Sequence, residues 1–212
     1  MEKRELVKKI INELKRAYPE APATYLNYRN PFELTIATIL SARTTDAAVN
    51  KLTPDLFARY PTPEKMAKAK IEDVVELIRG IGAYNRKAVY IVETSRSLVE
   101  NFGGSIPQNM DELITLKGVS RKTANVILSV AFNLSEGVVV DTHVGRVTVK
   151  LGLSEYDKQP EKIERDLMEM LPKTLWKDYA RIMGAHGRQT CKSFRPKCPE
   201  CRVNSVCPSA EI

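Results

Sequence analysis

The sequence predicts an all-α protein, and three observations support this fold class. Amphipathic stretches, with apolar residues at every third or fourth position, follow one another along nearly the whole chain of 212 residues. Prolines stand directly behind small polar residues, as at the first turn of a helix. Only the run Val138-Val139-Val140 has the composition of a strand, and a solitary run of that length cannot form a sheet.

The expected helices are short, so each must pack against others to be stable. In chain order we expect them at residues 6–17, 32–41, 47–60, 74–78, 87–101, 110–116, 122–132, 142–151, 161–171 and 175–188. The pairs that signal a helix start are Asn30-Pro31, Thr53-Pro54, Thr62-Pro63 and Gln159-Pro160. Asn30 is followed three residues later by Glu33, which is a variant of the capping box. No linker rich in glycine or serine divides the chain.

Composition and charge narrow the class of protein. Hydrophobic residues make up 43% of the chain and charged residues 28%, as in ordinary globular proteins. The N-terminal MEKRELVKKI has no apolar core of an export signal, and the longest apolar runs are too short to span a bilayer. We therefore expect an intracellular, cytoplasmic protein that does not bind a membrane. The net charge of +7 raises the odds of a nucleic-acid partner.

All four cysteines fall in one short window, in the pattern Cys191-x6-Cys198-x2-Cys201-x5-Cys207. Four thiolates suit either an iron–sulfur cluster or a structural zinc ion. Zinc sites usually consist of two separated short-spaced pairs, and only one pair here is short-spaced, which favours a cluster without deciding the matter. Two disulfides would fit a secreted protein, which the sequence does not indicate.

Basic residues surround these cysteines and predict a surface that faces phosphate. They are Arg188, Lys192, Arg195, Lys197 and Arg202, against the single acid Glu200. Such a loop could also be a solvated charged segment. Next to a metal centre, a phosphate-binding role for Lys192 and its neighbours is the better interpretation.

A glycine turn between two expected helices carries a second candidate site. The segment from 116 to 124 reads LKGVSRKTA, and Gly118 allows a tight hairpin. The helix after it begins at about Ser120, and its first N–H groups can bind a phosphate oxygen, whatever the base sequence. Lys122 then lies in the first turn, next to Arg121. Alone, this pattern could be a plain turn with a surface lysine.

The context makes the pattern specific. After the run of valines, Asp141-Thr142-His143 opens the next helix, and Asp141 is a candidate N-cap. In this order, the hairpin with Lys122, Asp141 and the four-cysteine loop closely resemble the endonuclease III family of the helix-hairpin-helix DNA glycosylase superfamily. The segments LSARTTD at 40–46, IGAYN at 81–85 and HGR at 186–188 also match, so the resemblance covers essentially the whole chain.

The resemblance implies a fold of two parts. A six-helix barrel at residues 24–135 would carry the hairpin, while residues 1–23 and 136–212 would fold together around a [4Fe–4S] cluster bound by the four cysteines. Its implied partner is double-stranded DNA with damaged bases or abasic sites, bound by a monomer associated with the nucleoid.

The resemblance also implies a reaction, namely removal of oxidised pyrimidines followed by cleavage of the strand at the abasic site by β-elimination. The damaged nucleotide must leave the stack before its sugar can be attacked. Lys122 would attack the deoxyribose C1′ and form a Schiff base. Asp141 would stabilise positive charge on the sugar and assist proton transfer. Gly118, Val119, Ser120 and Arg121 of the hairpin would bind the DNA backbone.

Some residues depart from the family pattern. Lys117 and Ser120 replace a proline and a glycine of the usual hairpin. Arg43 stands where a glutamine usually fills the gap left by the flipped nucleotide, and Ala83 replaces a larger wedge residue. These changes keep two alternatives open: the same scaffold acting on another lesion, such as pyrimidine dimers or mismatched bases, and a non-catalytic iron–sulfur module that binds DNA. The second alternative would predict loss of Lys122 or Asp141, and both are present.

Overall fold

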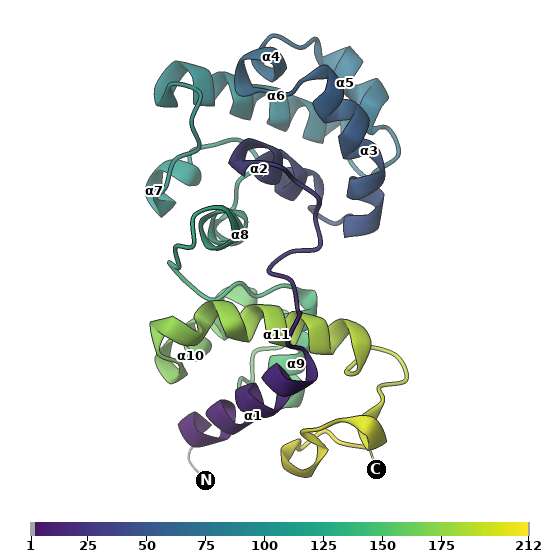
Figure 1. The fold of residues 1–212 in the computed structure, drawn as a ribbon, viewed down its shortest axis with the longest axis vertical. Coiled ribbons are helices and arrows are strands. Elements are labelled where there is room, and N and C mark those ends of the chain that lie inside the picture. The colour runs from purple at the N-terminus through teal and green to yellow at the C-terminus, as the bar shows by residue number, and fades with distance from the viewer. Residues whose placement is uncertain (1–2, 212) are drawn as a thin grey trace. The chain divides into compact units, whose positions relative to one another are not determined.

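The computed structural model describes residues 3–211 and confirms the all-α prediction, because that range contains helices and no strand (Figure 1). The chain forms two compact units. One is continuous and comprises Tyr25–Glu136. The other combines Met1–Thr24 with Gly137–Ile212, of which residues 3–24 and 137–211 are described. Each unit has its own hydrophobic core.

The unit Tyr25–Glu136 is built around α2. Its helices are α2 (Pro31–Leu40), α3 (Asp46–Arg59), α4 (Pro63–Ala67), α5 (Ile71–Ile78), α6 (Tyr84–Phe102), α7 (Met110–Leu113) and α8 (Arg121–Ala131). Every residue of α2 from Phe32 to Leu40 is buried, and the helix contacts α3, α6 and α8. A helix covered on all sides forms the middle of a helical domain, and α2 has that place here.

The start of α2 uses the predicted cap in a modified form. The side-chain oxygen of Asn30 accepts the Glu33 N–H at 2.9 Å, as expected. The Glu33 carboxylate does not return to the N–H of Asn30; it accepts from the backbone N–H of Arg29 at 2.8 Å and pairs with the Arg29 guanidinium at 2.6 Å. Glu33 is almost fully buried, so this pairing offsets the unfavourable burial of its charge.

The expected helix at residues 47–60 is confirmed, but the start signal predicted at Thr53-Pro54 is wrong. α3 begins at Asp46, where the Thr45 hydroxyl accepts the Ala48 N–H at 3.2 Å, and it continues through Pro54. A proline inside a helix removes a hydrogen bond and costs about 3 kcal/mol. α3 is maintained because one of its faces is buried in the core, through Val49, Leu56 and Phe57.

The second unit is formed by helices from both ends of the chain. They are α1 (Lys3–Ala17), α9 (Thr142–Lys150), α10 (Pro160–Met170) and α11 (Trp176–Gln189), with short 3₁₀ turns η1 (Lys173–Leu175), η2 (Cys198–Glu200) and η3 (Asn204–Val206). α11 contacts both α9 and α1. Trp176 opens α11 and donates its indole N–H to the Leu171 carbonyl at 3.0 Å.

The structure contains no helix, within residues 3–211, that is long and apolar enough to cross a membrane.

Candidate functional site

The hairpin between α7 and α8 has the tight form that the sequence predicts. Gly118 has a φ of +77°, and a Cβ added to it would lie 2.7 Å from Cδ2 of Tyr90. Both conformation and space therefore require glycine here. The Thr94 hydroxyl donates to the Lys117 carbonyl at 2.7 Å, and Val119 is buried, so the turn is fixed to α6 and to the core.

α8 begins immediately after this turn, with Ser120 as its N-cap. The Ser120 hydroxyl oxygen accepts the Thr123 N–H at 3.2 Å. The serine therefore caps the helix, and α8 has a well-defined first turn although the usual second glycine is absent. Ser120, Arg121 and Lys122 are all exposed. The hairpin thus presents a positive helix terminus and two cationic side chains to solvent.

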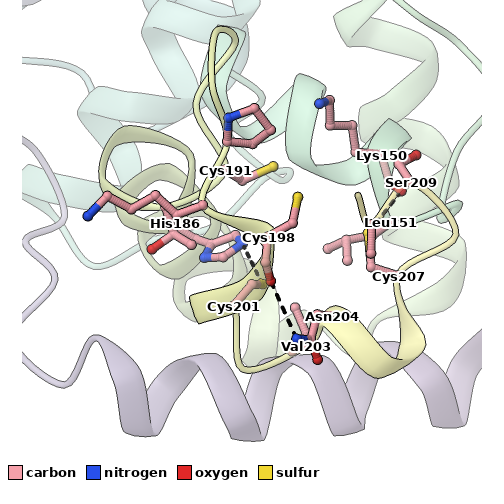
Figure 2. Close-up of a pocket in the computed structure, with 14 residues that line it drawn as sticks. Lys150, Leu151, His186, Cys191, Cys198, Cys201, Val203, Asn204, Cys207 and Ser209 are labelled. Carbon is pink, nitrogen blue, oxygen red and sulfur yellow. Dashed lines mark hydrogen bonds between the residues drawn. The ribbon is translucent and has the colours of Figure 1, made fainter. Parts of the chain in front are cut away.

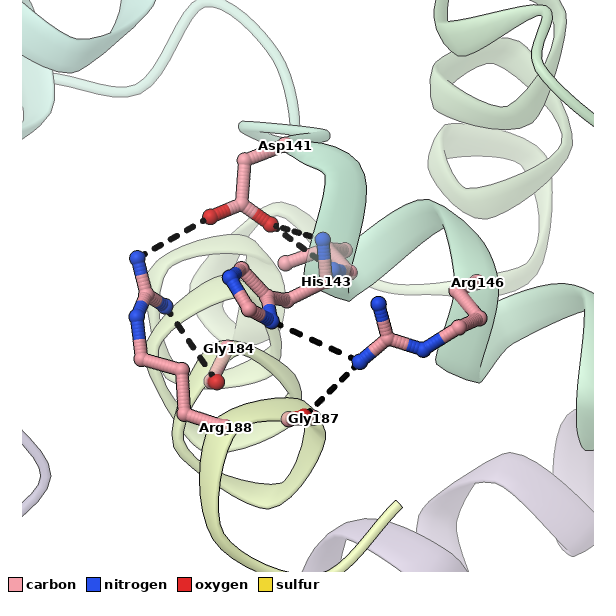
Figure 3. Close-up of polar contacts among 7 residues, drawn as sticks. Asp141, His143, Arg146, Gly184, Gly187 and Arg188 are labelled. Atoms are coloured by element: carbon pink, nitrogen blue, oxygen red, sulfur yellow. Dashed lines mark hydrogen bonds and ion pairs between the residues drawn. The ribbon is translucent and has the colours of Figure 1, made fainter. Parts of the chain in front are cut away.

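Asp141 caps α9 in the other unit, as predicted. Its Oδ1 accepts the N–H groups of His143 and Val144 at 2.8 and 2.7 Å. Its Oδ2 faces the Arg188 guanidinium at 3.4 Å (Figure 3). One carboxylate oxygen is therefore held by backbone, while the other faces the Arg188 side chain, which is 28% exposed.

α9 and α11 approach each other closely at the segment His186-Gly187-Arg188. A Cβ on Gly187 would lie 2.9 Å from the Cβ of His143, so only glycine allows this approach. Arg146 donates to the carbonyl oxygens of Gly187 and Cys191, at 2.7 and 2.9 Å. The bond to Gly187, drawn in Figure 3, joins α9 to α11, and the bond to Cys191 extends this contact to the first cysteine.

His143 lies within this contact, and burial lowers its pKa, partly offset by the nearby Asp141 carboxylate. Its Nδ1 is 3.4 Å from Arg146 Nη2. A neutral imidazole can accept that hydrogen bond, whereas a protonated one cannot. His143 therefore supports the geometry around Asp141 in its neutral form.

The four cysteines line one pocket in this unit (Figure 2). The other walls of the pocket include Leu151 and His186. A series of short backbone turns positions the sulfurs: the N–H of Cys201 donates to the Cys198 carbonyl at 3.1 Å, and the N–H of Cys191 to the His186 carbonyl at 2.8 Å. Lys192, predicted to bind phosphate, is exposed in this loop.

The electrostatics of the pocket reflect how close the cysteines are to one another. Burial raises the pKa of the Cys191 thiol, and the neighbouring Cys207 and Cys201 raise it further, against Lys150 and Arg146. Burial also raises the pKa of Cys201. Thiols in such a setting become thiolates when a bound metal takes the place of their protons. Within residues 3–211, no three potential ligands converge on one point as a single ion would require.

His186, which lines the pocket, is almost fully buried, and burial lowers its pKa to about 4. Its Nε2 is 3.7 Å from the Cys201 sulfur, and its Nδ1 is 3.0 Å from the Tyr18 hydroxyl. Tyr18 in turn contacts the Thr190 hydroxyl at 2.7 Å. With a thiolate at Cys201, the neutral ring donates from Nε2 and accepts from Tyr18, so every group is satisfied.

The two loops with departures from the family pattern lie in the unit Tyr25–Glu136. Arg43 is exposed between α2 and α3, with a φ of +54°. Ala83 is exposed directly before α6, with a φ of +57°. Left-handed conformations are uncommon for residues other than glycine and concentrate at functional sites.

The structure thus groups the predicted residues in three places. Gly118 to Lys122 share the hairpin, Arg43 lies in the loop after α2, and Asp141 belongs to the same unit as the cysteines and Lys192. Sequence reasoning missed one contact and one buried residue. Arg188 pairs with Asp141, although nothing in the spacing of the two residues links them. Lys87 is buried in α6, which its place on the apolar face, four residues before Ile91, could have revealed.

Comparison with known proteins adds independent information. Residues 36–173 match the model of the HhH-GPD superfamily base excision DNA repair protein. Endonuclease III of Synechocystis sp. is 44% identical over 209 residues, covering 99% of this chain and 94% of the relative.

Solved structures agree. A trapped endonuclease III–DNA covalent intermediate, in an estranged-adenine complex, matches with a TM-score of 0.93 and 39% identity, covering 99% of this chain and 98% of that one. A thermostable thymine-DNA glycosylase matches with a TM-score of 0.84 and 22% identity, over 98% and 96% of the two chains, which supports the fold alone. The chain therefore belongs to the endonuclease III family, within the HhH-GPD superfamily of base excision DNA repair proteins.

Proposed function

We propose that this chain is a bifunctional DNA glycosylase and abasic-site lyase that removes oxidised pyrimidines from duplex DNA. The observation that carries the proposal is the exposed Lys122 in the first turn of α8, directly after a rigid glycine hairpin, in a chain of the endonuclease III family. A relative that is 39% identical has been trapped as a covalent intermediate with DNA. A nucleophilic amine on this chain would account for the same type of adduct here.

Lys122 supplies the nucleophile in this proposal. Its neutral amine forms a bond to C1′ of the deoxyribose, and the bond from C1′ to the base breaks, so that the base leaves with the electron pair and gains a proton. The attached amine loses a proton, the C1′–O4′ bond of the sugar ring then breaks, and O4′ gains a proton, which leaves a protonated imine at C1′. This imine makes the C2′ proton acidic. Loss of that proton expels the 3′ phosphate by β-elimination, and water then releases the amine.

Asp141 is the proposed partner of this reaction. With Oδ1 already bonded to two backbone N–H groups, Oδ2 is the oxygen left to stabilise positive charge on the sugar and to move protons. The Arg188 guanidinium faces that same oxygen at 3.4 Å.

The hairpin is the proposed grip on the DNA backbone. Gly118, Val119, Ser120 and Arg121 form a turn at the positive end of α8, and such an end binds phosphate oxygen without reading the base sequence. Arg43 is the proposed residue that enters the space left by the extruded nucleotide. It is exposed on a short loop, and its side chain is long enough to reach a base edge or a phosphate.

The four cysteines are the proposed ligands of a [4Fe–4S] cluster. In a [4Fe–4S] cluster each of the four irons takes one thiolate, and this chain has four cysteines in one loop. Only the Cys198/Cys201 pair is short-spaced, whereas zinc sites usually have two short-spaced pairs, which supports the cluster. When bound, the cluster would link the loop segments covalently. The chain's own residues then present Lys192 and its basic neighbours to DNA.

The remaining expectations belong to the same proposal. We take the unit Tyr25–Glu136 as the barrel domain and the unit built from both chain ends as the cluster domain. The predicted boundary, between residues 23 and 24, lies one residue from that between the two units. We expect the protein to act as a monomer on the nucleoid, because its partner is duplex DNA.

Borohydride trapping tests the central claim. The enzyme would be incubated with duplexes that hold either an oxidised pyrimidine or a preformed abasic site, and covalent complexes would be counted for wild type, Lys122→Ala and Lys117→Ala. Lys117 is a neighbouring exposed lysine in the same hairpin, so it controls for loss of positive charge. We expect adducts on both duplexes with wild type and Lys117→Ala, and none with Lys122→Ala.

Trapping on the abasic duplex alone would retain the lyase chemistry but reject oxidised pyrimidines as substrates. A panel of duplexes with pyrimidine dimers and mismatched bases would then identify the lesion. Adducts that persist in Lys122→Ala would disprove the assignment of the nucleophile.

A further inference from the structure

Lys87 of α6 is an unusual residue, because it is a buried cation that pairs with no carboxylate among residues 3–211. Only 4% of it is exposed, and it is the one buried lysine or arginine among residues 3–211. Burial lowers the pKa of its ammonium group, and the nearby Arg86 lowers it further. A buried charge is unfavourable unless it makes specific hydrogen bonds, so the contacts of Lys87 indicate what it contributes.

The Lys87 ammonium group donates a hydrogen bond to the Thr44 hydroxyl oxygen at 2.7 Å. An ammonium group can only donate, so the Thr44 oxygen must accept and its own O–H remains free to donate. The Ala42 carbonyl oxygen lies 3.5 Å from that hydroxyl. The chain of contacts therefore runs from α6 to the peptide bond that joins Ala42 to Arg43.

Arg43 is the residue between these two attachment points. It is exposed and holds a left-handed φ of +54°, a conformation that persists only where the surrounding structure imposes it. The backbone N–H of Thr44 also donates to the Ser41 carbonyl at 3.0 Å. Thr44 thus fixes the loop on one side of Arg43 and, through Ala42, on the other.

The backbone of Lys87 has a matching role at the second loop. Its N–H donates to the Ala83 carbonyl at 3.0 Å and closes the first turn of α6. Ala83 is exposed and has a left-handed φ of +57°. One residue therefore secures both strained positions, with its side chain at the Arg43 loop (residues 41–45) and with its backbone at Ala83.

We propose that Lys87 is a positioning residue, whose bond to Thr44 holds the Arg43 loop in the conformation from which Arg43 enters the gap opposite an unpaired base. The inference rests on the proposed function and deepens it by naming what controls discrimination of the opposite base. A methionine would fill nearly the same volume without an unfavourable buried charge. The lysine is therefore explained by its bond rather than by packing.

The test uses the full-length protein with Lys87→Met, which removes the donor, and Thr44→Val, which removes the acceptor at the other end. Single-turnover base release would be measured on duplexes with thymine glycol opposite each of the four bases. Strand cleavage would be measured on a single-stranded oligonucleotide with one abasic site, which has no opposite base. Arg43→Ala, alone and combined with Lys87→Met, completes the set.

We expect Lys87→Met and Thr44→Val to slow base release about tenfold, since a displacement of about 1 Å in a positioning group can cost up to 10²-fold. The differences among the four opposite bases should shrink, whereas cleavage of the single strand should stay within about twofold of wild type. The melting temperature of Lys87→Met should not fall, because a buried cation has been removed. In the Arg43→Ala background, Lys87→Met should have no further effect.

Equal losses on duplex and single strand, in proportion to a lowered melting temperature, would reduce Lys87 to a structural residue. An undiminished effect of Lys87→Met in the Arg43→Ala background would also overturn the proposal. Failure of the proposed function has a different signature: wild type itself would release no base from any of the four duplexes. The inference, which depends on base release, would then be rejected with it.

Discussion

The hairpin at Gly118 and the cysteine loop (residues 191–207) both expose basic side chains, but they hold their shape by different means. The hairpin is fixed by buried side chains, since Leu116 and Val119 are covered and Tyr90 packs against the glycine. The cysteine loop has only one buried hydrophobic residue, Val203, and is otherwise held by short backbone turns. The hairpin is therefore specified by the folded chain alone, whereas the loop depends on its proposed metal centre.

Loss of one cysteine ligand should have the largest effect on stability. It should affect the cysteine loop and leave the hairpin unchanged. Cys198→Ser should remove visible absorbance and destabilise the unit with the loop by at least about 5 kcal/mol, given the roughly 10–16 kcal/mol of structural zinc sites. Hydrogen exchange should accelerate at residues 186–207 and stay slow in α2. Ser205→Ala, an exposed residue of the same loop, is the matched control. Equal acceleration in both units would contradict the comparison.

Gly118→Ala should break the hairpin by packing. Left-handed φ and contact with Tyr90 together should destabilise the protein by about 2–4 kcal/mol, lowering its melting temperature by about 5–15 °C. Gly103→Ala is the control, because Gly103 also has a positive φ, +58°, but has open space where a Cβ would stand. It should cost about 1 kcal/mol. Equal losses in the two variants would mean that packing against Tyr90 contributes nothing.

Ser120→Ala should weaken the hairpin through its cap alone. The variant removes the acceptor of the Thr123 N–H and should cost about 1 kcal/mol in chemical denaturation. Ser120→Gly should cost only about a few tenths of a kcal/mol, because glycine is also tolerated at the cap position. Phosphate binding should survive in both, since it uses backbone N–H groups. A large loss of DNA affinity in Ser120→Ala would instead assign the hydroxyl to DNA.

Mildly acidic pH should have the smallest effect on stability. It should destabilise the unit that contains the histidines and leave the other unit unchanged. Both histidines, His143 and His186, lie outside the unit Tyr25–Glu136. The pKa of His143 is lowered by burial, so below pH about 6.5 the unfolded chain binds more protons than the folded one. Stability should therefore fall as the pH drops, by less than about 1.4 kcal/mol per pH unit for this residue. Thermal melts of wild type and His143→Gln between pH 7.5 and 5.5 would measure it, and identical slopes would exclude His143.

Helix content could be predicted from the sequence because it follows from local patterns. Apolar periodicity and caps such as Asn30 and Asp141 act over a few residues, and the structure agrees with them. Thr53-Pro54 was misinterpreted for the same reason: the local signal of a helix start was present, but buried contacts of Val49 and Phe57 maintain α3 across it. Tertiary packing decided that position, and it is not visible in a local window.

The candidate site divides in the same way. The hairpin and the cysteine loop are each continuous in sequence, so their spacing predicted them. The pairing of Arg188 with Asp141 and the bond from Lys87 to Thr44 join residues 47 and 43 positions apart. Such contacts exist only because helices pack, and no motif encodes them. The burial of Lys87 could have been predicted from its position on the apolar face of its helix, whereas its bond to Thr44 could not.

The division of one unit between both ends of the chain has a consequence for biosynthesis. Residues 3–24 are synthesised before the unit Tyr25–Glu136, yet the apolar face of α1 packs in a core with helices that follow residue 137. The unit Tyr25–Glu136 can fold while translation continues, but α1 must wait for about 75 more residues, roughly 4–15 s at typical bacterial rates. During that interval α1 exposes Val7, Ile10 and Leu14, which are buried in the finished unit, so chaperones can bind this half of the molecule until residues 137–211 have followed.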